Sequence, residues 1–187
     1  YAISASVPGS SVVSGTTFVN AGILVIKRAK LRIEPSGLAS YGDIGKLRQP
    51  AIHVYDQGEV VVDGGAFDSL ISVGLDSTQP PASCGSLGNF LVLGGGKLTL
   101  NGVDVRRGPR RAGDHASGTG IAGCDGGTIE LRGGTTVGGF APFGTGVSSF
   151  DGALTITEGS LVAGNQYGVI TGGGVAGRVV QRTTLSG

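Results

Sequence analysis

Apolar and polar residues alternate in short runs that recur in the same order along the chain. In each run two apolar residues flank one other residue, and a further large side chain follows five residues later. The copies begin at Leu31, Val60, Leu98, Ile129 and Leu154, and a degraded sixth copy begins at Arg178. Alternation with a period of two predicts β-strands in which every second side chain points inward.

A second apolar element precedes each copy, as at residues 22–25 and 51–54, and glycine pairs such as Gly64-Gly65 and Gly133-Gly134 mark the junctions. Glycine adopts the positive φ that sharp turns need, so these pairs predict turns. One unit then reads strand, turn, strand, small residue, short strand and variable segment. The extra length falls at one point, in residues 39–50, 69–88 and 106–119. A fixed unit with insertions at one point is typical of a solenoid.

The repeat predicts an all-β fold, a parallel β-helix of about six coils with long loops on one side. In such a fold the inward side chains of successive coils stack in columns. One expected column is Ile33, Val62, Leu100, Leu131, Ile156 and Val180, and another is Leu38, Phe67, Val105, Thr136, Leu161 and Leu185. The alternative is an antiparallel β-sandwich or barrel, in which hairpin turns would join similar strands.

The repeats also resemble a known family. Residues 97–108, which begin Lys97-Leu98-Thr99-Leu100, and residues 152–165, which include Leu154-Thr155-Ile156, look like coils of right-handed β-helix proteins of the pectin-lyase-like superfamily. Residues 31–37 resemble a coil opening common in extracellular β-helix proteins. The pattern is most similar to repeats of bacterial surface proteins and of autotransporter or polymorphic outer-membrane passengers. This resemblance, which covers residues 20–187, implies a single-stranded right-handed parallel β-helix solenoid.

Length and composition fit one extracellular or cell-surface domain over residues 1–187, with residues 1–20 irregular or forming a first partial coil. The formal net charge of +1 gives no general attraction to nucleic acid. No apolar run reaches the roughly eighteen residues of a membrane span. The sequence offers no amphipathic capping helix at either end, and uncapped solenoid ends invite pairing. We therefore expect a segment of a longer solenoid, or a chain that covers its ends by association.

Two cysteines, Cys84 and Cys124, lie in a variable segment and in a turn. A disulfide between them would pin that segment to the stacked strands and would suit an oxidising compartment. Two unpaired thiols are the alternative, because spacing alone does not establish a bridge.

The third variable segment carries a cluster of arginines, which are Arg106, Arg107, Arg110 and Arg111, followed by His115. Guanidinium groups bind carboxylates and sulfates in bidentate fashion, so the cluster is a candidate site for an acidic glycan or an acidic protein surface. It partly matches the Arg-x-Pro-x-x-Arg pattern of pectate lyases, but Ala112 stands at the last position. A solvated charged loop without a ligand is the alternative.

Candidate catalytic residues are few. Outward positions of neighbouring coils place Glu34 beside Asp63, and stacked strands lie about 4.8 Å apart, near the roughly 5 Å separation of a retaining carboxylate pair. An ordinary polar strand surface explains the same residues. Neither His53 nor His115 has the spacing of a metal site, so we expect no metal and no cofactor.

Three functions stay open. The first is a non-catalytic structural or adhesive segment of a surface protein or filament, favoured by regular polar outer strands without a convergent acid–base set. The second is a carbohydrate-active enzyme, a polysaccharide lyase or phage-type depolymerase. The third is a glycan-binding module that uses the arginine cluster without chemistry. The superfamily includes both enzymes and adhesins, so the fold alone does not decide.

Overall fold

The computed structural model describes residues 3–5, 8–13, 23–34, 39–41, 52–69, 88–107, 119–138, 143–172 and 182–185. These residues form β-strands and turns and contain no helix. Three sheets, here named A, B and C, hold all the strands, and every strand pairing in the described part of the chain is parallel. Parallel pairing throughout excludes the antiparallel sandwich or barrel.

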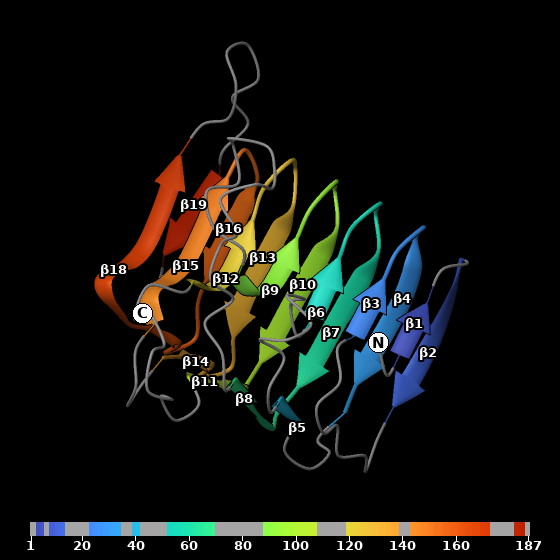
Figure 1. Cartoon of the computed structure of the whole chain (residues 1–187), viewed down its shortest axis with the longest axis horizontal. Helices are drawn as coiled ribbons and strands as arrows, with labels where there is room; N and C mark the ends of the chain where they lie inside the picture. Colours follow the sequence, from blue (N-terminus) through green and yellow to red (C-terminus); the bar gives the residue numbers. More distant parts are fainter. Residues whose placement is uncertain are drawn as a thin grey trace.

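Successive strands along the chain belong to different sheets (Figure 1). Sheet A contains β1 (Ile3–Ala5), β3 (Ile23–Val25), β6 (Ile52–Val54), β9 (Gly88–Val92), β12 (Thr119–Gly123), β15 (Phe143–Phe150) and β18 (Gly164–Gly172). Sheet B contains β2 (Gly9–Val13), β4 (Ala29–Ile33), β7 (Glu59–Asp63), β10 (Lys97–Asn101), β13 (Thr128–Arg132), β16 (Ala153–Ile156) and β19 (Arg182–Leu185). Sheet C contains β5 (Ala39–Tyr41), β8 (Ala66–Ser69), β11 (Asp104–Arg107), β14 (Thr136–Val137) and β17 (Leu161–Val162).

The core follows the period of two that the sequence predicts. In β4 and β7 every second residue is buried, and the intervening residues face outward. The first expected column is confirmed from Ile33 to Ile156, because the strand register joins Ile33, Val62, Leu100, Leu131 and Ile156. Side chains from all three sheets belong to one apolar cluster.

The end of that column was predicted incorrectly. Ile156 pairs with Leu185 of β19, so Leu185 stands at the position expected for Val180. Val180 itself lies outside the described residues. In β19 the position in register with Leu154 holds Thr183, so this copy lacks the apolar pair that marks the other copies.

The second expected column was also displaced at several members. Val105 pairs with Val137 rather than Thr136, and Phe67 pairs with Ala39 rather than Leu38. Leu161 faces outward and is 53% exposed, while Val162 continues the column that contains Val137. For Thr136 and Leu161 the cause is the length of the turns between sheets B and C. Residues 132–135 and 157–160 form closed turns, each held by a hydrogen bond from the amide of the fourth residue to the carbonyl of the first. Each of these turns adds one residue between the inward-facing positions of the two sheets.

Four successive connections from sheet A to sheet B have the same length. They are the four-residue turns 26–29, 55–58, 93–96 and 124–127, each closed by a bond from the fourth amide to the first carbonyl. Both central residues of every one of these turns have positive φ, including the non-glycine residues Lys27, Arg28, Asp56 and Gln57. Each turn also bonds to the next through the backbone. The amide of Arg28 donates to the carbonyl oxygen of Asp56, that of Gln57 to the carbonyl oxygen of Gly94, and that of Gly95 to the carbonyl oxygen of Asp125.

Candidate functional site

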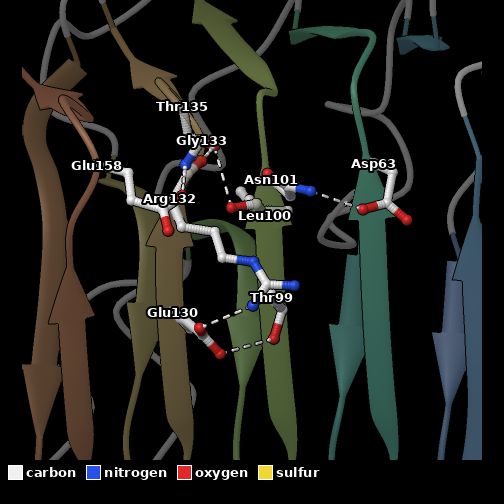
Figure 2. A network of polar contacts seen from close by, with 9 residues as sticks. All are labelled: Asp63, Thr99, Leu100, Asn101, Glu130, Arg132, Gly133, Thr135 and Glu158. Carbon is white, nitrogen blue, oxygen red and sulfur yellow. Dashed lines mark hydrogen bonds and ion pairs between the residues drawn. The ribbon is translucent and has the colours of Figure 1, made fainter.

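The outer face of sheet B brings the two catalytic candidates together. Asp63 ends β7, and Glu34 directly follows β4, so each lies one residue beyond the paired residues Val62 and Ile33. Arg32 Nη2 lies 2.7 Å from Asp63 Oδ2, and Arg32 Nε lies 4.0 Å from Glu34 Oε1. Asn101 Nδ2 donates to Asp63 Oδ1 at 2.9 Å (Figure 2). The two carboxylates therefore share one guanidinium, and Asp63 also accepts from an amide on the strand beyond.

A second polar group on the same face surrounds Glu130 (Figure 2). Thr99 Oγ1 donates to Glu130 Oε2 at 3.3 Å, and Arg132 Nη1 donates to Glu130 Oε1 at 3.3 Å. Thr99 is only 3% exposed although it faces outward. Sequence reasoning missed Glu130 as a partner, although Glu130 aligns with Thr99 in the repeat.

Residues 133–135, which follow β13, form hydrogen bonds with the neighbouring repeats on both sides. The amide of Gly133 donates to Glu158 Oε2 at 2.9 Å, and the amide of Gly134 donates to the Glu158 carbonyl at 2.9 Å. The buried Thr135 hydroxyl accepts from the Val103 amide at 3.2 Å. The same hydroxyl lies 3.0 Å from the Leu100 carbonyl oxygen and 2.7 Å from the Arg132 carbonyl oxygen (Figure 2). These bonds fix the turn whose extra residue displaced the second column.

Only the beginning of the arginine cluster belongs to the described residues. Arg106 and Arg107 are the last residues of β11, and their backbones lie in register with Asp68 and Ser69 of β8. Arg110, Arg111 and His115 lie outside the described residues.

Cys124 directly follows β12, opens the turn 124–127, and is buried. Cys84 lies outside the described residues, so the disulfide remains a prediction.

Peptide mapping of the unreduced protein is expected to recover a peptide that links Cys84 to Cys124. Full alkylation of both thiols without a reductant would contradict the bridge.

His53 lies on the outer side of β6, between the inward-facing Ile52 and Val54. Its ring packs against Tyr55 with centroids 4.8 Å apart, and burial lowers the pKa of the imidazole. Its Nε2 atom is buried and has no hydrogen-bond partner among the residues that the structure describes. Protonation would therefore place a charge where the structure provides no acceptor.

The His53 environment predicts an acid-sensitive stability. A histidine with a lowered native pKa binds its proton more readily in the unfolded chain, so its contribution is complete above about pH 6.5 and declines as the pH falls below that value. Urea unfolding at several pH values is expected to show this decline in wild type. His53→Gln should lack this component, and parallel pH curves for the two proteins would contradict the prediction.

Among the described residues, no group of three or more His, Cys, Asp or Glu side chains could hold a metal ion. That part of the chain also contains no helix long and apolar enough to cross a membrane.

The polar contacts of sheet B thus form the best-defined candidate site in the described structure, and the arginine cluster begins at the end of sheet C. Comparison of the chain with protein-family models, with curated proteins and with solved structures finds no match.

Proposed function

We propose that this chain is a non-catalytic, extracellular segment of a right-handed parallel β-helix, with a structural or adhesive role in a surface protein or filament. The order of the strands supports the solenoid. From β3 to β19 the chain passes through sheets A, B and C in turn, and each strand pairs with strands one repeat away. Parallel strands joined by a crossover are almost always connected with a right-handed sense, which supports the handedness.

The observation that carries the structural role is the mutual pairing of charges on sheet B. Lys30 Nζ lies 2.9 Å from Glu59 Oε2, Arg32 pairs with Asp63, and Arg132 pairs with Glu130. An active site needs an acid, a base or a nucleophile directed toward a shared substrate position. Here the polar groups are directed toward one another along the sheet, as suits a rigid surface.

An extracellular or cell-surface location is part of the proposal. It rests on the similarity of the repeats to those of bacterial surface proteins and on the expected disulfide, since disulfides persist in oxidising compartments.

The structural role is tested by assaying the purified protein on acidic polysaccharides. Neither new reducing ends nor unsaturated products are expected. Product formation that is lost in Asp63→Asn, with an unchanged circular dichroism spectrum, would overturn the non-catalytic assignment. Arg32→Gln serves as a matched variant, because it removes the guanidinium that Glu34 and Asp63 share but keeps both carboxylates.

A second candidate function is the binding of an anionic glycan or an acidic protein surface by the arginine cluster. The observation that favours it is the position of Arg106 and Arg107, the first two residues of the cluster, at the end of β11 in sheet C. A charged segment held at one end by a paired strand loses less conformational freedom on binding than a free chain.

Replacement of Arg106, Arg107, Arg110 and Arg111 by Ser tests this second function. The thermal unfolding temperature should change little, because the cluster follows the last inward-facing valine of β11, Val105. Any binding to heparin-like or uronate glycans at low ionic strength should be lost. If wild type does not bind these glycans, the second function is rejected.

A further inference from the structure

The outer face of sheet B carries three rows of side chains that cross its central strands β4, β7, β10 and β13. We call these twelve residues the charged face. The register aligns Lys30, Glu59, Lys97 and Thr128 in the first row, Arg32, Val61, Thr99 and Glu130 in the second, and Asp63, Asn101 and Arg132 in the third. Glu34, the residue after β4, completes the third row, one residue beyond the last pair of the register, Ile33 and Val62. Both signs of charge occur in the face, and no charged residue has the same charge as the residue at the mirrored position on the other side of its centre.

This arrangement of charges suits a two-fold axis that relates two copies of the chain. Consider a two-fold axis that lies parallel to the strands, midway between β7 and β10, just above the charged face. The axis places a second copy over the first with rows preserved, so that β4 faces β13 and β7 faces β10. Interfaces related by a two-fold axis must be complementary to themselves.

Under that operation each charge meets an opposite charge or a neutral polar group of the second copy. Three facing pairs have opposite charges: Arg32 with Glu130, Glu34 with Arg132, and Glu59 with Lys97. Asp63 faces Asn101, Val61 faces Thr99, and Lys30 faces Thr128. The charged face therefore contains no like-charge pair in this arrangement.

Other positions of the axis bring fewer opposite charges together. An axis between β10 and β13 creates no like-charge pair within the charged face, but it also creates no opposite-charge pair, since Lys97 then faces Thr128, Thr99 faces Glu130 and Asn101 faces Arg132. An axis centred on β7 places Glu59 opposite Glu59, and an axis centred on β10 places Lys97 opposite Lys97. An axis between β4 and β7 places Glu34 opposite Asp63. The pattern of charges thus selects one register among the neighbouring ones.

We propose that the charged face is a surface for self-association, which binds a second copy of this chain face to face about that axis. The side chains of Lys30 and Arg32 are 63% and 55% exposed, so they can reach a facing sheet while they keep their contacts with Glu59 and Asp63. Complementary charges fix orientation and partner choice more than they add affinity. The proposal needs only the register of sheet B and does not depend on the proposed function.

The size of the surface sets the expected strength. Six strands, from β2 to β16, at a spacing of about 4.8 Å and with four or five residues of about 3.3 Å each, present roughly 450 Å² per copy. The two copies together bury roughly 900 Å², which falls in the range of weak and transient complexes. The association should therefore be concentration-dependent and should weaken as salt screens the facing charges.

Sedimentation equilibrium of the full chain, at high protein concentration and at low and high ionic strength, measures the association. Wild type is expected to dimerise and to dissociate at high salt. Lys97→Glu and Glu59→Lys should each raise the dissociation constant about tenfold or more, because each introduces two like-charge pairs across the axis. Lys27→Glu is the matched control for Lys97→Glu, since it makes the same charge change in an exposed turn outside the charged face, and it should leave the constant unchanged.

Mixing the two variants gives the decisive result. In a mixed pair the unchanged Glu59 of one copy meets the unchanged Lys97 of the other. The two substituted side chains, which now carry the reversed charges, also meet as an opposite-charge pair, so the heterodimer should regain wild-type affinity. An arrangement that used other surfaces would not show this rescue. A monomeric wild type at low salt, or a mixture that stays monomeric while both variants keep the wild-type circular dichroism spectrum, would overturn the proposal.

Discussion

Leu131→Asp is expected to leave the chain unfolded. Leu131 is fully buried in β13, between Leu100 of β10 and Ile156 of β16. Removal of a buried leucine side chain alone costs about 2–5 kcal/mol, and an unpaired carboxylate in an apolar interior adds a larger cost. The sum approaches or exceeds the net stability of an ordinary domain, about 5–15 kcal/mol. Circular dichroism and limited proteolysis would report the loss of structure.

Thr128→Asp is the matched control in the same strand. Thr128 faces outward and lies in register with Lys97, so a new carboxylate gains a basic neighbour. The free energy of unfolding should change by less than about 0.5 kcal/mol. Equal damage from the two substitutions would mean that β13 does not alternate between core and surface.

The second large effect concerns a glycine where two backbone segments approach closely. A Cβ atom on Gly96 would lie 2.7 Å from the Val54 carbonyl oxygen and 3.0 Å from the Leu93 carbonyl oxygen. The Leu93 amide donates to the Val54 carbonyl oxygen, and the Gly96 amide donates to the Leu93 carbonyl oxygen. Because both oxygens accept backbone hydrogen bonds, neither can move away freely. Gly96→Val should therefore lower the free energy of unfolding by about 3 kcal/mol, the upper part of the range for overpacking.

Gly95→Asn tests the same turn without the collision. Gly95 has a φ of 71°, which asparagine tolerates better than most residues, and the nearest atom to an added Cβ is Gln57 Cγ at 3.6 Å. A loss of about 1 kcal/mol or less is expected. Chemical denaturation compares the two variants, and a smaller loss for Gly96→Val than for Gly95→Asn would contradict the assigned close approach.

The strands and their inward faces could be predicted from the sequence because a period of two is a local property. The columns could be predicted only where the turns keep their length. Between Leu100 and Val105 the chain advances five residues, but between Leu131 and Val137 it advances six, because Thr135 is added to the turn. Thr135 resembles any other polar loop residue in the sequence, and its role depends on a bond to Val103, which lies one repeat earlier.

The candidate site could be predicted in part for a similar reason. The neighbouring positions of Glu34 and Asp63 follow from aligned repeats. The side-chain conformation that directs Arg32 toward both carboxylates, and the burial of the outward-facing Thr99, depend on contacts between strands. Sequence periodicity contains no information about such contacts.

The four equal turns between sheets A and B, from residues 26–29 to residues 124–127, restrict how this protein can be altered by engineering. The amide of Gly95 donates to the backbone carbonyl oxygen of Asp125, and the amide of Gly126 donates to that of Asp151. Each turn is therefore bonded to its neighbour. One added residue would break the bonds to the turns on both sides. The described strands of sheet C are followed by segments of very different length, such as residues 42–51 and 70–87. A peptide epitope or a tag placed between those strands and the next strand of sheet A would leave the ladder of turns intact.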